Sequence, residues 1–260
     1  MFERIEFNED GEKLLCEMGG KNADMLMTIK VKLLKKDETM VFFSDTDEIA
    51  VLLTEGEVGF KWDGKAETGR RANPFDMKPY CLHVSKNTTF TVTGIAEKSE
   101  IVIQRTDNDA EFEAKFYTPE NCLYQEFGKG QWDGAGYRVV STMFDKDNEP
   151  QSNMVMGEVF NKPGRWSSYP PHSHPQPEVY YYRFDKPQGF GAAYNGDEVY
   201  KSTDGSYLTI DKCEHEQVTA PGYTMYYVWM IRHLDGDAWL KTTRIVGDEH
   251  KWLLHDNWTD

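Results

Sequence analysis

Alternation of apolar and polar residues is the main pattern along this chain, and it predicts many short β-strands. Residues 25–33 alternate from Met27 onward, as expected for a strand with one buried face. Residues 49–53 form an apolar run that stops at Glu-Gly-Glu, and residues 58–62 form the next strand, which ends at an Asp-Gly turn signal. The expected first β-rich block is completed by strands at residues 81–84, 89–93 and 101–103.

A second block of expected strands begins near Leu123. Asn-Gly, Asp-Gly and Pro-Gly pairs mark the turns between its strands, and long amphipathic helical patterns are lacking. This spacing of short strands favours an all-β sandwich or barrel. The expected strands of this block cover residues 137–140, 154–160, 178–184, 190–194, 199–201, 206–210, 217–220, 225–231 and 239–245.

The two blocks resemble a loose duplication without a strict repeat period. Residues 105–122 are rich in Asp, Glu, Asn and Pro, which is typical of a linker. We therefore expect one domain at residues 1–118 and a second at residues 119–260.

Composition and charge exclude several classes of protein. The chain has 260 residues, enough to bury a core without disulfides, and its four cysteines are far apart. Its 29 basic and 44 acidic residues give a net charge of −15, which disfavours nucleic-acid binding. Neither a signal peptide nor a membrane-spanning stretch is visible, so we expect a cytoplasmic protein that does not bind membranes.

The histidines are distributed unevenly, and imidazole is a common metal ligand. Six of the seven lie after residue 150, and His83 is the exception. We expect His83 to be a half-buried structural histidine, and His250 and His255 near the end of the chain to face solvent.

One cluster in the second block predicts a divalent-metal site. His172 and His174 are two residues apart, so on a strand both side chains project from one face. Glu178 follows closely, and two imidazoles with one carboxylate leave coordination positions for water or substrate. As a fourth ligand we expect His215, which opens a predicted strand, with His233 as its rival.

Strand parity extends this prediction to the neighbouring aromatic residues. If Glu178 faces the interior of a barrel, Tyr180 and Tyr182 face the same way, whereas Tyr181 and Arg183 point toward another layer or subunit. A tyrosine beside a metal can donate a hydrogen bond or carry a proton. Ordinary packing inside a barrel explains these aromatic side chains equally well.

Several segments resemble a known family. Residues 165–174 (Arg-Trp-Ser-Ser-Tyr-Pro-Pro-His-Ser-His), followed by residues 178–184 (Glu-Val-Tyr-Tyr-Tyr-Arg-Phe), resemble the signature of the 5-deoxy-glucuronate isomerases. That family is related to the 5-keto-4-deoxyuronate isomerases. Residues 186–190 and 220–227 are similar to the same family, and residues 89–93 resemble its first half. The resemblance implies a bicupin, with two β-barrel domains and a metal site in the second.

The resemblance also implies an activity and a ligand set. The activity is the conversion of 5-deoxy-D-glucuronate to 5-dehydro-2-deoxy-D-gluconate in myo-inositol catabolism, or the isomerisation of a related uronate. The family's ligands fall on His172, His174, Glu178 and His215. They would hold one divalent ion that acts as a Lewis acid, with zinc as the first choice and manganese, iron or nickel as alternatives.

Aldose–ketose isomerisation moves a proton from C2 to C1, and a sugar acid also needs a cation for its carboxylate. Tyr182, Tyr227 or Glu178 is the expected base. Arg165 is the expected carboxylate ligand because a guanidinium can bind a carboxylate through two hydrogen bonds. Arg183 is the alternative, which strand parity disfavours.

Two other functions fit the same ligands. A cupin dioxygenase would use iron in a cage of three histidines and one glutamate. A non-catalytic sugar-binding cupin would bind its ligand without turnover. In each case we expect a small molecule as the ligand, and for the isomerase a sugar acid and a homodimer or larger homo-oligomer.

Overall fold

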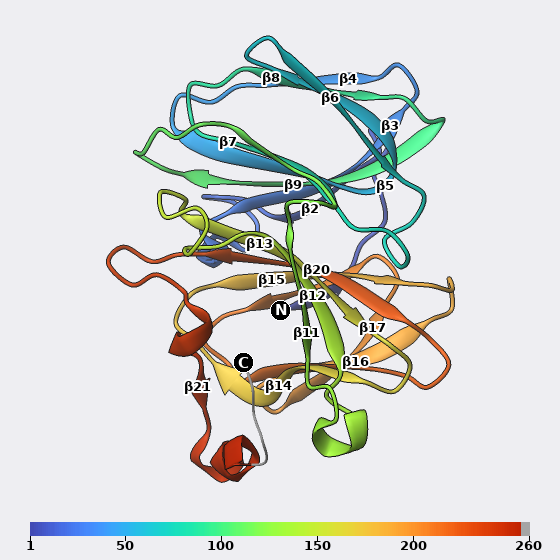
Figure 1. The fold of residues 1–260 in the computed structure, drawn as a ribbon, viewed down its shortest axis with the longest axis vertical. Coiled ribbons are helices and arrows are strands. Elements are labelled where there is room, and N and C mark those ends of the chain that lie inside the picture. The colour runs from blue at the N-terminus through green and yellow to red at the C-terminus, as the bar shows by residue number, and fades with distance from the viewer. Residues whose placement is uncertain (256–260) are drawn as a thin grey trace. The chain divides into compact units, whose positions relative to one another are not determined.

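The computed structural model describes residues 1–255 and consists almost entirely of β-strands, which confirms the all-β prediction (Figure 1). The chain forms two compact units. The N-terminal unit comprises Glu6–Cys122 and Met143–Met154, and the C-terminal unit comprises Met1–Ile5, Leu123–Thr142 and Val155–Asp260. The boundary expected between residues 118 and 119 stays a prediction, and residues 256–260 of the expected second domain lie outside the described residues.

The N-terminal unit is built on one branched sheet. Its strand order is β10-β7-β5-β9-β3-β2, with β6 and β8 joined to β5 and β4 joined to β8. Apolar side chains from these strands pack into one buried core. The elements are β2 (Glu12–Cys16), η1 (Ala23–Met25), β3 (Thr28–Lys35), β4 (Thr39–Phe42), β5 (Asp47–Trp62), β6 (Lys65–Arg71), β7 (Tyr80–Val84), β8 (Phe90–Gly94), β9 (Lys98–Asp107) and β10 (Lys115–Tyr117).

The prediction of two separate strands at residues 49–53 and 58–62 is wrong, because β5 runs through both as one strand. The pairing register with β9 shifts between Leu53 and Glu55, which is a bulge that bends a strand without ending it. Gly56 has a φ of 106° and packs directly against Ser99, so a side chain at this position would overlap its neighbour. The first half of β5 pairs with β7 and β9, and the second half pairs with β6 and β8.

The expected linker also contains regular structure. Strand β9 extends to Asp107, and β10 pairs with β7 in the same sheet. The many polar residues of this segment therefore lie on either side of a short strand at the edge of the sheet.

A buried carboxylate organises the N-terminal unit around residues 143–154. Glu48 accepts hydrogen bonds from the Ser152 hydroxyl at 2.9 Å and from the Asn153 backbone N–H at 2.7 Å, and His83 Nε2 lies 2.9 Å from the same side chain. His83 is fully buried rather than half-buried. Its contacts fit the structural role expected from the sequence.

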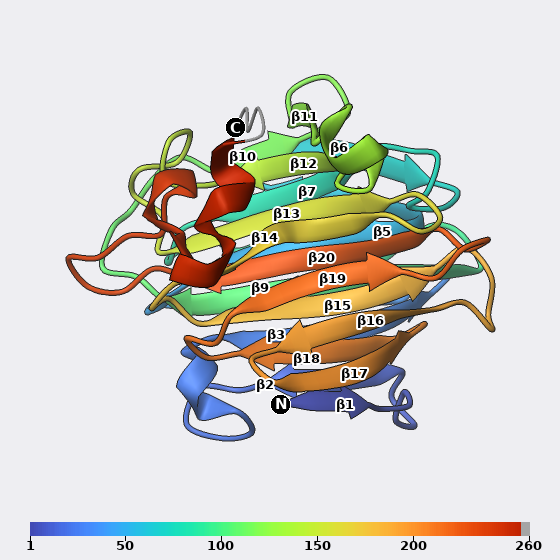
Figure 2. The ribbon, with the colours of Figure 1, turned by 90° about the horizontal axis from the view of Figure 1, so that it is seen from below.

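The C-terminal unit consists of two facing sheets. The first has the order β1-β18-β15-β20-β13-β12-β11, and the second has the order β17-β16-β19-β14-β21. In Figure 1, β13, β15 and β20 run above β14 and β16, and Figure 2 shows β16, β17 and β19 in shades of orange. The strands are β1 (Phe2–Arg4), β11 (Leu123–Phe127), β12 (Arg138–Phe144), β13 (Met154–Asn161), β14 (Trp166–Ser173), β15 (Glu178–Phe184), β16 (Phe190–Asn195), β17 (Glu198–Thr203), β18 (Ser206–Ile210), β19 (His215–Thr219), β20 (Met225–Arg232) and β21 (Ile245–Val246).

Three short helical turns accompany the strands among the described residues of this unit, and one of them overturns a sequence-based expectation. The strand expected at residues 239–245 is wrong, because η3 (Lys241–Thr243) occupies its centre. The Thr243 hydroxyl donates to the Leu240 carbonyl at 2.8 Å and accepts from the Leu240 N–H at 3.0 Å. Such local hydrogen bonds compete with strand pairing. The remaining turns of this unit are η2 (Gln131–Gly134) and η4 (Asp248–His255).

Within residues 1–255, no helix has the length and apolar character needed to span a bilayer.

The packing of β13 against β20 yields a testable prediction. The Trp229 indole lies directly over Gly157, where an added methyl group would overlap it. We expect Gly157→Ala to destabilise the protein by about 1–3 kcal/mol, the usual cost of overpacking a core. Gly59→Ala is the matched control, because its methyl group would meet Ile95 Cδ1 at 3.7 Å, an ordinary contact. Urea unfolding monitored by circular dichroism compares the two, and equal midpoints would contradict this packing.

Candidate functional site

The pairing of two strands brings the predicted histidines together. His172 lies near the end of β14, His174 follows that strand directly, and His215 opens β19. Strands β14 and β19 are antiparallel, with His172 opposite His215. Glu178 opens β15 in the facing sheet. The four side chains therefore meet between the two sheets of the C-terminal unit.

The four side chains form a compact, buried cluster. One nitrogen from each of the three imidazoles lies within 4.8 Å of the others. Glu178 Oε2 lies 3.2 Å from His174 Nε2 and 3.2 Å from His215 Nε2. Each of the four residues is at most 6% exposed.

The hydrogen bonds of the imidazole rings show which nitrogens face the centre of the cluster. In each ring, Nδ1 lies within hydrogen-bond distance of a backbone carbonyl, so Nδ1 carries the proton and a neutral ring presents an Nε2 lone pair. His215 Nε2 is buried and makes no hydrogen bond of good geometry. This arrangement of ring nitrogens and backbone acceptors is the one found around metal-bound histidines, so the cluster could bind a metal. The pairs are His172 Nδ1 with Pro170 O at 2.9 Å, His174 Nδ1 with Gln176 O at 2.9 Å, and His215 Nδ1 with Cys213 O at 3.0 Å.

Electrostatics within the cluster favour one anion surrounded by imidazoles. Burial lowers the pKa of His172 well below its usual value, and the charges of His215 and Arg244 act in the same direction. Burial alone would raise the pKa of Glu178, but the neighbouring imidazoles of His174 and His215 outweigh it and lower that pKa to about 2. Glu178 is therefore ionised at neutral pH, and its charge is available to a bound cation.

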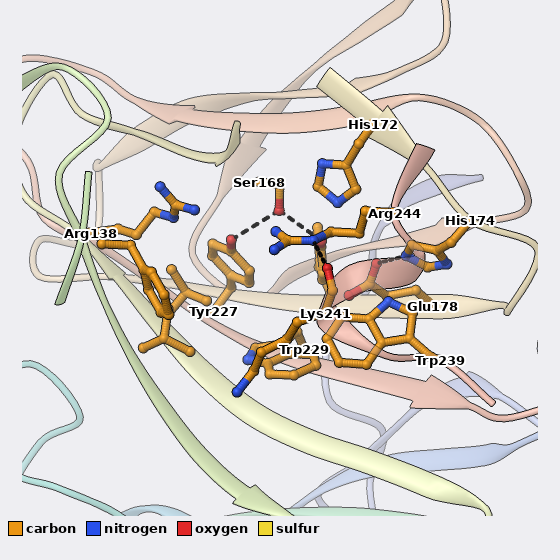
Figure 3. Close-up of a pocket in the computed structure, with 14 residues that line it drawn as sticks. Arg138, Ser168, His172, His174, Glu178, Tyr227, Trp229, Trp239, Lys241 and Arg244 are labelled. Atoms are coloured by element: carbon orange, nitrogen blue, oxygen red, sulfur yellow. Dashed lines mark hydrogen bonds and ion pairs between the residues drawn. The ribbon is translucent and has the colours of Figure 1, made fainter. Parts of the chain in front are cut away.

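A cavity opens beside the cluster (Figure 3). Hydroxyl groups lie next to the histidines in its wall, where Ser168 Oγ is 2.9 Å from Tyr180 OH and 3.5 Å from Tyr227 OH. Ser168 has a φ of 50°, a strained conformation of the kind that often marks functional sites. The lining residues are Phe127, Arg138, Val140, Val159, Ser168, His172, His174, Glu178, Tyr180, Tyr227, Trp229, Trp239, Lys241 and Arg244.

Of the three side chains expected to act in catalysis, Tyr227 lines this cavity and the other two do not. The Tyr182 hydroxyl donates to Gln217 Oε1 at 2.6 Å inside the buried core. The Arg165 guanidinium lies beside Gly134. The catalytic roles of all three stay predictions. The side chains of β15 alternate in direction as expected, since Tyr180 and Tyr182 pack in the core while Arg183 forms an ion pair with Asp204.

The other histidines lie outside the cluster of His172, His174 and His215. Nδ1 of His233, the rival ligand, accepts a hydrogen bond from the backbone N–H of Trp239 at 3.0 Å. His250 is partly buried and lies near Glu214 and Glu249, a grouping that is common at acidic surfaces without a metal. The exposure expected for the His255 side chain lies outside the described residues.

Sequence reasoning missed the three cations of the cavity wall, Arg138, Lys241 and Arg244. Arg138 opens β12 without a recognisable motif, and the other two lie in the segment that was expected to be a strand. One signal was available, because the sugar acid expected from the sequence would require nearby cations in a strongly acidic protein.

Comparison with known proteins identifies a family for the chain. Residues 2–253 match the model of the KduI/IolB family. A 5-deoxy-glucuronate isomerase of Shouchella clausii is 26% identical over 73% of this chain and 76% of its own length. Another protein of that name, from Geobacillus kaustophilus, is 24% identical over 86% of this chain and 84% of its own length.

Solved structures extend the similarity to the fold. An IolB-like protein of Salmonella typhimurium LT2 superimposes with a TM-score of 0.79 at 22% identity, over 88% of this chain and 90% of that chain. A cupin barrel protein of Leptotrichia buccalis superimposes with a TM-score of 0.51 at 14% identity, over 85% and 88% of the two chains. These similarities confirm the predicted cupin fold.

The cluster yields a prediction about metal content. We expect His174→Ala to lose the bound metal and the isomerase activity, because the cluster would lose one of its four ligands and Glu178 would lose one of the two imidazoles beside it. His250→Ala is the control and should keep the metal of the cluster, since His250 lies in a separate group with Glu214 and Glu249. Elemental analysis measures the metal content of both purified variants, and an isomerase assay measures their activity. One equivalent of metal in His174→Ala would disprove the ligand assignment.

Proposed function

The chain belongs to the KduI/IolB family and is an isomerase, and we propose that it converts 5-deoxy-D-glucuronate to 5-dehydro-2-deoxy-D-gluconate in myo-inositol catabolism. The observation that carries this proposal is the family match over residues 2–253. Relatives named 5-deoxy-glucuronate isomerase also match this chain over most of their own length. A related uronate is the alternative substrate.

We propose that His172, His174, Glu178 and His215 hold one divalent ion, with zinc as the first choice and manganese, iron or nickel as alternatives. Three imidazole nitrogens and one carboxylate suit such an ion, and the backbone carbonyls at each Nδ1 would fix the rings that bind it. When bound, the ion would supply Lewis-acid polarisation of the sugar carbonyl and the neighbouring hydroxyl.

We assign the proton chemistry to two groups that line the cavity. Burial raises the pKa of Tyr227 to about 12, so its hydroxyl keeps its proton at neutral pH and can donate a hydrogen bond to a sugar oxygen. Glu178 is the ionised group at the other side of the cavity, and if one of its carboxylate oxygens stays free of the ion it is the candidate acceptor of the C2 proton. Tyr182, the other candidate from the sequence, directs its hydroxyl to Gln217 instead.

The two rival functions have less support. The dioxygenase and the non-catalytic sugar-binding protein fit the same four side chains, but the relatives named above are isomerases. A cytoplasmic location and a homodimer or larger homo-oligomer, which we expect from the sequence, also belong to our proposal.

Metal removal tests the proposed reaction. We expect the purified enzyme to convert 5-deoxy-D-glucuronate in a reaction followed by proton NMR, and to lose this activity after dialysis against a chelator. Addition of one divalent metal at a time should restore activity and identify the native ion. Conversion that is unaffected by complete metal removal would refute the metal-dependent mechanism.

Two conservative variants test the roles of the tyrosines. We expect Tyr227→Phe to lower kcat by roughly 10²-fold or more, because its hydroxyl lies in the cavity and positioned proton donors typically contribute 10²–10⁴-fold. Tyr182→Phe should lower kcat less, since its hydroxyl bonds Gln217 in the core. Steady-state kinetics of both variants make the comparison, and a larger loss in Tyr182→Phe would reverse the assignment.

A further inference from the structure

The cavity has two chemically different ends. The histidines and Glu178 form one end, and Figure 3 shows Arg138 on the opposite side, with Tyr227 and Ser168 between them in this view. Among the described lining residues, Glu178 is the one acid, whereas Arg138, Lys241 and Arg244 bring three positive charges. A ligand with a metal-binding end and an anionic end would match this distribution.

Arg138 is built into the wall rather than extended from the surface. It is 5% exposed, and its guanidinium carbon lies 5.3 Å from the ring centre of Phe127, another lining residue. Its Nη1 donates to the Gly136 carbonyl at 3.2 Å, which fixes one side of the guanidinium. Its charge also reaches the Tyr227 hydroxyl, because it is among the groups that lower the pKa of that tyrosine against the effect of burial. A buried, oriented guanidinium is well suited to a carboxylate.

We propose that Arg138 binds the carboxylate of the substrate and thereby determines which end of the sugar reaches the metal-binding cluster. The identity of that sugar rests on the proposed function. Arg138 is thus a specificity-determining residue: it selects acids over neutral aldoses and places C1 and C2 beside His172 and Glu178.

The other cations of the wall suit different tasks. Arg244 lies toward the cluster, since its charge acts on His172, and its Nε donates to the Lys241 carbonyl at 2.9 Å. Lys241 Nζ contacts Gln125 Oε1 at 3.3 Å, and an ammonium group lacks the planar pair of donors that a carboxylate prefers. These two cations therefore raise the local positive potential, while Arg138 supplies the directed contact.

An unpartnered donor in the cavity wall also suits a polar ligand. Trp239 lines it and is 7% exposed, yet its indole Nε1–H has no hydrogen-bond partner. Its ring centre lies 6.3 Å from that of His174, at the cluster end. A buried donor without a partner is costly unless a ligand or water satisfies it. A sugar hydroxyl beside the cluster would do so while the carboxylate is held by Arg138.

Kinetics with two matched substrates test the proposal. The acid is 5-deoxy-D-glucuronate, and the neutral probe is 5-deoxy-D-glucose, which carries a hydroxymethyl group in place of the carboxylate. For Arg138→Gln we expect kcat/KM for the acid to fall by about 100-fold, mainly through KM, while kcat/KM for the neutral aldose stays within about 3-fold. Arg138→Lys should recover part of the preference. Arg70→Gln, an exposed arginine of the N-terminal unit, is the control for the loss of one positive charge.

Arg165→Gln separates this proposal from the sequence-based one. If Arg165 binds the carboxylate, its variant will lose the preference for the acid and Arg138→Gln will keep it. That pair of results would overturn our proposal. An equal loss on the acid and the neutral probe in Arg138→Gln would also overturn it, because it would indicate a general structural role.

A binding measurement keeps the proposal separable from the proposed reaction. D-gluconate and D-glucitol differ in the carboxylate, and their binding can be followed by tryptophan fluorescence, with Trp239→Phe to assign the signal to the cavity. We expect the native protein to prefer gluconate at least 10-fold, and Arg138→Gln to show no preference. Gluconate selectivity that depends on Arg138, in a protein without isomerase activity, would support this site and refute the proposed reaction. Isomerase activity in the native protein, together with unchanged gluconate selectivity in Arg138→Gln, would support the proposed reaction and refute this site.

Discussion

The hydrogen bonds between three imidazole Nδ1 atoms and backbone carbonyls are the constraint on which the site depends. Each carbonyl belongs to a residue two positions from its histidine, so the local backbone sets the ring orientation and the position of the proton. Distant packing is not needed for this step. The sheets then have one remaining task, which is to bring three pre-oriented rings and Glu178 to the same place. The pairing of β14 with β19 and the position of β15 in the facing sheet accomplish it.

This division explains what could be predicted from the sequence. The short spacing from His172 to Glu178 is a local signal, and β15 begins and ends at the expected residues. His215 was identified because it opens a strand, and β19 begins there. The wall of the cavity could not be predicted in this way, because Arg138 and Arg244 are far apart in the chain and meet the histidines through tertiary structure. The strand predicted at residues 239–245 is wrong, because the hydroxyl of Thr243 stabilises a turn that the sequence pattern does not reveal.

The charge of the cavity is opposite to that of the whole chain. A net charge of −15 repels a sugar acid at long range, but screening at physiological salt limits that repulsion to roughly 8 Å. Close to the wall, the three cations of the cavity dominate the potential. A chain of this composition can therefore bind an anion, provided that the cations are concentrated in one enclosed place. The first sheet and the segment after β20 provide this enclosure together.

Strand β1 has a consequence for how the protein is made. Phe2 pairs with Leu208 and Arg4 with Ser206, at the edge of the sheet that carries Glu178. On the ribosome, the first strand emerges long before its partner exists, while the strands of the other unit are translated in between. Residues 2–4 cannot form their native pairing until residues 206–208 have been synthesised, so that edge of the sheet is completed late in folding. The order of translation and the order of assembly are therefore different in this molecule.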